Sequence, residues 1–151
     1  MKKLMLGAAF ALALVAAGCG GGGDGGGGDK LTKEAYAAQL NTICNEANET
    51  FSQLSGGTMA EFKQKGDDVV DAAEKAAGEF HDVRGPDELV SASGTFNDSA
   101  DEIVEDLEKM NEAAQNDNQE EFDAAAESLG HHGAENDEAA KEIGATDCAG
   151  S

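Results

Sequence analysis

The sequence predicts an all-α protein, an up-down-up-down four-helix bundle that follows a cleaved signal peptide and a disordered glycine-rich linker. Three observations support this prediction. From residue 31 onward, apolar residues recur every three or four positions in four segments, without the alternation typical of a strand. The connections between these segments are short, which makes neighbouring helices antiparallel. Before residue 31, an apolar run gives way to a glycine tract. We therefore divide the chain into residues 1–18, 19–30 and 31–151.

Residues 1–18 have the three-part layout of a secretory signal peptide. Lys2 and Lys3 precede an apolar run over residues 4–17, and small residues come just before Cys19. This run is shorter than the ~20 residues that a helix needs to span a bilayer, so cleavage is favoured over the alternative, a retained membrane anchor. The sequence therefore predicts an exported protein.

The segment VAAGC, which ends at Cys19, resembles the lipobox of bacterial lipoproteins, although Ala16 stands where such boxes more often carry leucine. The resemblance implies that Cys19 receives a thioether-linked diacylglycerol, with fatty acyl chains such as palmitate, and becomes the first residue of the mature chain. Two acyl chains hold a protein firmly on a membrane, whereas one binds only marginally. Residues 20–29 are mainly glycine, which predicts a flexible tether between the bilayer and the domain. We expect no cofactor besides this lipid.

The chain is strongly acidic, with 31 Asp and Glu against 10 Lys and Arg and a formal net charge of −21. Loss of Lys2 and Lys3 with the signal peptide moves this charge by two units, to −23. Nucleic acid is therefore excluded as a partner, because binding it requires many Lys and Arg to neutralise phosphates. The acidic surface is either a solvated coat that keeps the protein soluble or a surface that attracts cations or a basic envelope protein.

The three cysteines fit an exported protein once Cys19 is assigned to lipid. Cys44 and Cys148 then remain, and two cysteines in an oxidising compartment permit one disulfide. The alternative, a two-cysteine metal site, lacks a CxxC motif or a close Cys-His spacing. In the chain-entropy model, closing so long a loop stabilises a domain by up to about 4–5 kcal/mol.

The first two helices have clear ends. The first is expected over residues 33–54, after Thr32 as its cap and before the SGG sequence that stops it. The second begins at TMAE, a capping box in which the Thr58 hydroxyl accepts from the Glu61 amide and the Glu61 carboxylate accepts from the Thr58 amide. It ends at the Arg-Gly-Pro sequence of residues 84–86, since proline cannot donate to the helix ladder.

The third helix is expected from Pro86, in its first turn, to about Gln115. Its residues on one side form the uninterrupted seam of a bundle helix: Leu89, Ser93, Phe96, Ala100, Ile103, Leu107, Met110 and Ala114. The fourth helix follows a reciprocal cap between Asn118 and Glu121.

The middle of the fourth helix is its weak part. Gly130 and Gly133 each cost about 1 kcal/mol relative to alanine, and Asn136 falls where the apolar seam should pass. We therefore expect a kink or a break between residues 130 and 136. Because the fourth helix runs antiparallel to the first, its end lies near the start of the first. The tail must then fold back along the first helix for its cysteine to reach the one at position 44.

A single histidine cluster, ESLGHHGAE, is a candidate metal site. On a helix, Glu127 and His131 are four residues apart, as are His131 and Glu135, while His132 and Glu135 are three apart. Two to four ligands can therefore share one side of the helix. Imidazole together with carboxylate suits Zn, Cu or Fe. The alternative is a solvated histidine pair near a helix break, because polar residues are mostly exposed.

No residue pattern predicts an enzyme. A hydrolase needs a nucleophile held by a base and an orienting group, and the chain has neither a nucleophile elbow nor a catalytic Cys-His arrangement. Adjacent acids such as Asp101 and Glu102 point to different helix faces, and we interpret them as solvent-facing charge.

Two segments far apart in the chain resemble parts of a known family. The pairing of LTKEAYAAQLNTICNEAN with KEIGATDCAG, and RGPDEL between the second and third helices, resembles small exported actinobacterial lipoproteins. These have an early Ile-Cys helix and a terminal Gly-x-x-x-Cys-x-Gly tail. The resemblance implies export, a disulfide and a helical fold, but no activity. We therefore expect a lipid-anchored protein on the extracytoplasmic face of the cell membrane, with a non-catalytic binding or structural role. The alternative is an exported metal-binding helical bundle.

Overall fold

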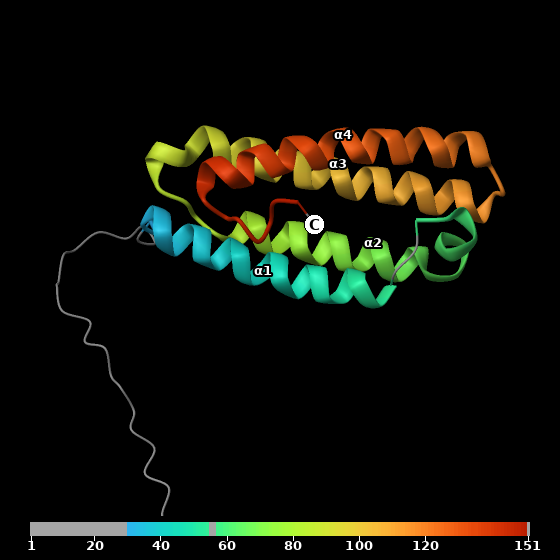
Figure 1. Cartoon of the computed structure of the whole chain (residues 1–151), viewed down its shortest axis with the longest axis horizontal. Coiled ribbons are helices and arrows are strands. Elements are labelled where there is room, and N and C mark those ends of the chain that lie inside the picture. Colours follow the sequence, from blue (N-terminus) through green and yellow to red (C-terminus); the bar gives the residue numbers. More distant parts are fainter. Residues whose placement is uncertain (1–29, 55–56, 151) are drawn as a thin grey trace, which may run out of the picture.

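The four predicted helices are present. A computed structural model describes residues 30–54 and 57–150. These residues form α1 (Lys33–Leu54), α2 (Met59–Asp82), the short 3₁₀ helix η1 (Asp87–Leu89), α3 (Val90–Gln115) and α4 (Gln119–Ile143), and they contain no strand. Consecutive long helices run in opposite directions (Figure 1), which confirms the all-α, up-down-up-down bundle. The predicted signal peptide, Cys19 and linker residues 20–29 lie outside the described residues.

Side chains predicted to cap three helices do so. At α1, the Thr32 hydroxyl accepts from an amide of the first turn at 3.3 Å. At α2, the Thr58 hydroxyl accepts from the Glu61 amide, as predicted. The return contact differs, since the Glu61 carboxylate accepts from the Thr58 hydroxyl at 2.6 Å rather than from its backbone amide. At α4, Asn118 Oδ1 accepts from the Glu121 amide at 3.3 Å.

The third helix begins with a tighter turn than predicted. Pro86 precedes η1, whose last residue, Leu89, donates its amide to the Pro86 carbonyl at 3.0 Å. The α-helix itself starts at Val90 and ends at Gln115, the predicted end. Short 3₁₀ turns are frequent at helix N-termini, so this difference moves only the first turn.

The predicted break in the fourth helix is wrong, because α4 is helical throughout. A Cβ at Gly130 or Gly133 would meet no atom of residues 30–54 or 57–150 within 4 Å, so among these residues neither glycine marks a close contact that interrupts the helix. Bonds to α3 hold this part of α4 in place. Asn136 Nδ2 donates to the Phe96 carbonyl at 2.9 Å and to the Ser99 hydroxyl at 3.0 Å. These tertiary contacts outweigh the intrinsic cost of glycine in a helix.

The core consists of two clusters, one toward each end of the bundle. Each contains an edge-to-face aromatic pair: Phe80 with Phe96, ring centroids 4.9 Å apart, and Phe62 with Phe122, 5.4 Å apart. Many of the remaining buried positions are alanines: Ala76, Ala77, Ala92, Ala100, Ala113, Ala114, Ala139 and Ala140. The core is therefore built from small side chains around a few rings.

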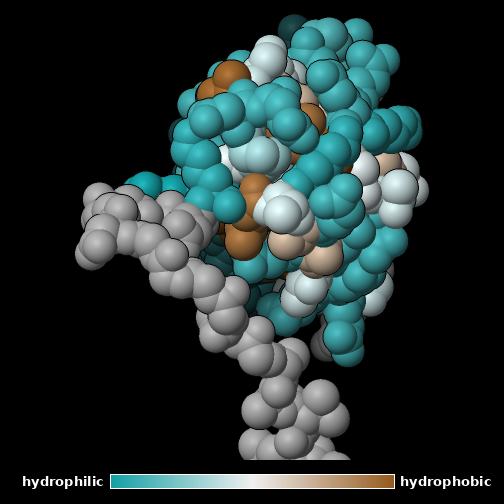
Figure 2. Space-filling view, turned by 90° about the vertical axis from the view of Figure 1, so that its left-hand side faces the viewer, coloured by the Kyte–Doolittle hydropathy of each residue, from teal (hydrophilic) through white to brown (hydrophobic). Residues whose placement is uncertain are grey.

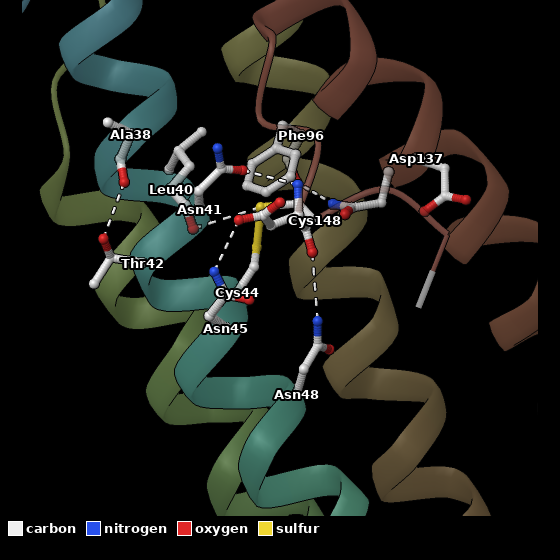
Figure 3. The surroundings of a disulfide bond; sticks show 12 residues. Ala38, Leu40, Asn41, Thr42, Cys44, Asn45, Asn48, Phe96, Asp137 and Cys148 are labelled. Atoms are coloured by element: carbon white, nitrogen blue, oxygen red, sulfur yellow. Dashed lines mark hydrogen bonds between the residues drawn. A yellow bond between two sulfur atoms is a disulfide. The ribbon is translucent and has the colours of Figure 1, made fainter.

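The C-terminal tail folds back along α1, as predicted. α4 ends at Ile143 and is capped by Gly144, whose φ of 95° is the left-handed conformation of a glycine cap. The tail then lies beside α1, and Cys148 forms a disulfide with Cys44 (Figure 3). Asp147 bonds through its amide, carboxylate and carbonyl to three side chains of α1: Asn41, Asn45 and Asn48.

The surface of the described residues is mainly polar. Figure 2 shows hydrophilic side chains over most of the bundle end where α1 and α3 begin, with small hydrophobic patches among them. Val90, at the start of α3, is a large hydrophobic residue that is 73% exposed. Among the described residues, no helix has the length and apolar character needed to cross a membrane.

Candidate metal centre

His132 lies on α4 and contacts α3 through both of its ring nitrogens. Its Nδ1 atom is 2.7 Å from Oδ2 of Asp106 on α3. The Asp106 side chain is only 1% exposed, so a buried carboxylate accepts a hydrogen bond from the imidazole. A histidine held through Nδ1 in this way presents Nε2 to a metal, the arrangement of carboxylate–histidine–metal triads.

Two glutamates lie near the imidazole of His132. Glu102, one helical turn before Asp106 on α3, places Oε2 at 3.5 Å from His132 Nε2. Glu135 follows His132 by three residues on α4. One ligand atom from each of Glu102, His132 and Glu135 lies within 4.8 Å of the other two. We call these three residues the metal triad.

The buried carboxylate that orients the imidazole has partners on both oxygens. His132 bonds one of them, and Lys109 Nζ lies 3.5 Å from the other, Oδ1 of Asp106. Such partners are required, because burying an unpaired charge is strongly unfavourable. The Lys109 side chain is 60% exposed, so its charge is screened by water. His132 is therefore the main partner of Asp106 within the bundle.

The metal triad offers one imidazole nitrogen and two carboxylates. The side chains of Glu102 and Glu135 are about half exposed, at 50% and 47%, so water can complete the coordination of an ion. Zinc binds histidine and glutamate in four-coordinate sites that keep one position for water. Copper and iron accept the same ligand types. An ion held here would link α3 to α4.

The structure brings together two of the four ligands predicted from the sequence. His132 and Glu135 belong to the metal triad, whereas Glu127 and His131 lie outside it. The His131 side chain is 71% exposed, and its Nε2 is 3.6 Å from Oε1 of Glu135. His131 therefore lies at the edge of the site, and Glu127 is exposed on the surface of α4.

From the sequence we interpreted adjacent acids such as Asp101 and Glu102 as solvent-facing charge, and we did not single out Asp106. Glu102 is half exposed but faces His132, and Asp106 is buried. A sequence signal for Asp106 exists, because four buried residues of α3 recur every seven positions: Ala92, Ser99, Asp106 and Ala113. A seven-residue repeat marks a stripe that faces a neighbouring helix. An acid within such a stripe indicates a buried polar partner.

Other ion pairs lie on exposed helix faces. His81 Nε2, on α2, is 3.0 Å from both carboxylate oxygens of Asp101 on α3, and both side chains are about half exposed. Among the described residues, no third ligand joins this pair. Elsewhere on α2, the hydrogen bond and charge of Glu79 raise the pKa of the exposed Lys75 above its ordinary value.

Comparisons with known proteins identify no relative of this chain. No family model, no curated protein and no solved structure matches this chain. The resemblance to exported actinobacterial lipoproteins therefore stays a prediction. Any function of the metal triad must be argued from its geometry.

Proposed function

We propose that the protein is an exported, lipid-anchored protein of the cell envelope that binds a divalent metal ion in a non-catalytic role. One observation carries the metal: buried Asp106 bonds Nδ1 of His132, and Glu102 lies 3.5 Å from the opposite ring nitrogen. A ligand atom of Glu135 lies within 4.8 Å of one from each of these two residues, His132 and Glu102. A solvated histidine pair would have no need of a fixed ring orientation. This arrangement favours the metal-binding alternative over a purely structural role.

The ligand types limit the choice of metal. One imidazole and two carboxylates suit divalent zinc, copper or iron, and at a site of given ligands Cu²⁺ binds more tightly than Zn²⁺ or Fe²⁺. The net charge of −21 raises the concentration of cations near the protein. The same acidity would attract a basic envelope protein, with an affinity that falls as salt rises.

Calorimetric titration tests whether the protein binds a metal ion. The unlipidated mature chain, residues 19–151 with Cys19→Ser, should bind one Zn²⁺ or Cu²⁺ ion per molecule. His132→Gln should abolish this binding, because it removes the only imidazole of the metal triad. His81→Gln is the matched control, since His81 also faces a carboxylate of α3 but belongs to no group of three ligands. Unchanged affinity in His132→Gln would disprove the metal site.

A second pair of variants separates the metal triad from the ligands predicted by sequence spacing. Glu102→Gln should weaken binding at least tenfold, because an amide is a poorer ligand than a carboxylate and lacks its charge. Glu127→Gln should leave the affinity within twofold of wild type, since Glu127 lies outside the triad. If Glu127→Gln weakened binding and Glu102→Gln did not, the metal site would instead lie on the exposed face of α4.

The lipid anchor rests on the resemblance of VAAGC to a lipobox, and mass spectrometry tests it. Protein extracted from membranes should be heavier than residues 19–151 by the mass of a diacylglycerol and its acyl chains. Cys19→Ser should abolish that increment and release the protein from the membrane fraction, because the tether then carries no acyl chain. A membrane-bound, unacylated protein would refute the anchor.

A further inference from the structure

A cleft of about 230 Å³, partly open to solvent, lies within the bundle beside the disulfide. All four helices and the tail contribute to its wall. The tail borders it through Cys148, near Asn48 and Asp137 (Figure 3). The cleft is separate from the metal triad, none of whose residues lines it.

The cleft exists because the helices present small side chains to it. Three of these are buried alanines of α2, namely Ala73, Ala76 and Ala77, and Ala100 stands opposite on α3. Larger apolar residues complete the wall: Phe51, Phe80, Ile103 and Val104. The small alanine side chains leave space between the helices, and Cys148 of the tail borders that space.

Three polar side chains line the cleft, Asn48, Asn136 and Asp137, and Asn48 Nδ2 donates to the Asp147 carbonyl at 3.4 Å. Asn136 Nδ2 is already bonded to the Phe96 carbonyl and the Ser99 hydroxyl, which leaves its Oδ1 as the remaining polar atom. Asp137 contributes a carboxylate, one oxygen of which accepts from the tail. A molecule in the cleft would therefore meet the side-chain oxygens of Asn136 and Asp137, which bind donors, and the carboxylate of Asp137 repels anions.

We propose that this cleft binds a small hydrophobic molecule that carries a hydrogen-bond donor and no negative charge. An apolar cavity of about 150 Å³ binds benzene, so the larger and partly open space here fits an aromatic molecule larger than benzene or an aliphatic chain of similar size. Apolar walls favour its transfer from water. The net charge of −21 disfavours anionic ligands over neutral or cationic ones. This inference goes beyond the proposed metal function and is independent of it.

A pair of fluorescent probes tests the proposal. N-phenyl-1-naphthylamine is neutral and has an N–H donor, and 1-anilinonaphthalene-8-sulfonate has the same rings with an anionic group. The unlipidated mature chain should bind the neutral probe saturably, one molecule per chain. The sulfonate should bind at least tenfold more weakly, and the difference should shrink as salt screens the charge. Absence of saturable binding, or equal affinity for both probes at low salt, would overturn the proposal.

Substitutions at two glycines of α4 give one variant that fills the cleft and one matched control. Gly133 lines the cleft and Gly130 does not, and at both a Cβ would meet nothing within 4 Å. Gly133→Leu should weaken binding of the neutral probe at least tenfold, whereas Gly130→Leu, with the same gain in helix propensity, should stay within twofold of wild type. Equal effects of the two variants would contradict the proposed site.

A second substitution that fills the cleft keeps the test valid if Gly133→Leu disturbs the fold. Ala47→Leu adds volume from α1, at a half-buried position on the wall of the cleft. It should also weaken the neutral probe at least tenfold while the helical circular dichroism signal stays unchanged. Wild-type affinity in both Ala47→Leu and Gly133→Leu would show that the probe binds elsewhere.

Discussion

At the scale of single residues, polar side chains inside the bundle fix the register of its helices and orient the imidazole of the proposed metal site. Asp106 is buried beside His132, and Asn136 reaches from α4 to the backbone of α3. Helices lined mainly by alanine can slide along one another, because alanine contacts are nearly alike at every turn. A buried polar pair is satisfied in only one register, since any other leaves its members unpaired.

Replacing the orienting carboxylate should weaken metal binding without removing a ligand. Asp106→Asn keeps an oxygen that accepts from His132 Nδ1 but loses the charge that makes the imidazole a stronger ligand. We expect an affinity for Zn²⁺ about 10–100-fold lower, the usual effect of losing such a partner. Calorimetry measures it, with Asp101→Asn at the exposed His81 pair as the control. Equal affinities for Asp106→Asn and wild type would mean that Asp106 only stabilises the fold.

At the scale of elements, helix ends were more predictable than helix middles. Caps such as Thr58 and Asn118 act through residues three positions away, so the sequence contains all of the information. The continuity of α4 depends instead on contacts with α3, which no local pattern reveals. Glu102 was missed for the same reason, since its partner His132 lies on another helix. Only the spacing of buried residues along α3 pointed toward that face.

Replacement of a helix glycine by alanine should change the stability of the protein in opposite directions at Gly130 and Gly66. Gly130→Ala should stabilise the protein by about 0.5–1 kcal/mol, because the site is exposed, helical and without neighbours at the Cβ position. Gly66→Ala should destabilise it, since its Cβ would lie 2.1 Å from Oδ1 of Asn111 and disturb the bond from Asn111 to Asp67. Denaturant unfolding followed by circular dichroism measures both. Destabilisation by Gly130→Ala would indicate a contact at this position.

At the scale of the whole molecule, the tail and its disulfide connect the first helix of the domain, α1, to the last one, α4. The two cysteines left after Cys19 is assigned to lipid predicted a bridge, and the antiparallel order of the helices predicted the direction of the tail. The sequence did not predict how the tail is held. Asp147 bonds to three asparagines of α1, and the Gly150 amide donates to Asp137 of α4. Together these bonds place the tail between the first and last helices.

Loss of the disulfide should therefore cost much of the domain's stability. The bridge joins residues 104 apart in the chain, and closing a loop of this length is worth up to about 4–5 kcal/mol in the chain-entropy model. Stabilities of whole domains are ~5–15 kcal/mol, so Cys44→Ala/Cys148→Ala should lower the denaturant midpoint steeply.

Asp147→Ala separates the covalent link from the bonds around it. This variant removes the carboxylate bonded by Asn45 but retains the disulfide and the backbone bonds of residue 147. The bond is exposed, so its loss should cost about 1 kcal/mol or less. Reduced wild-type protein should unfold at the same denaturant concentration as the double cysteine variant. If Asp147→Ala is as unstable as that variant, hydrogen bonds rather than the cross-link fix the tail, and the entropic account of this bridge fails.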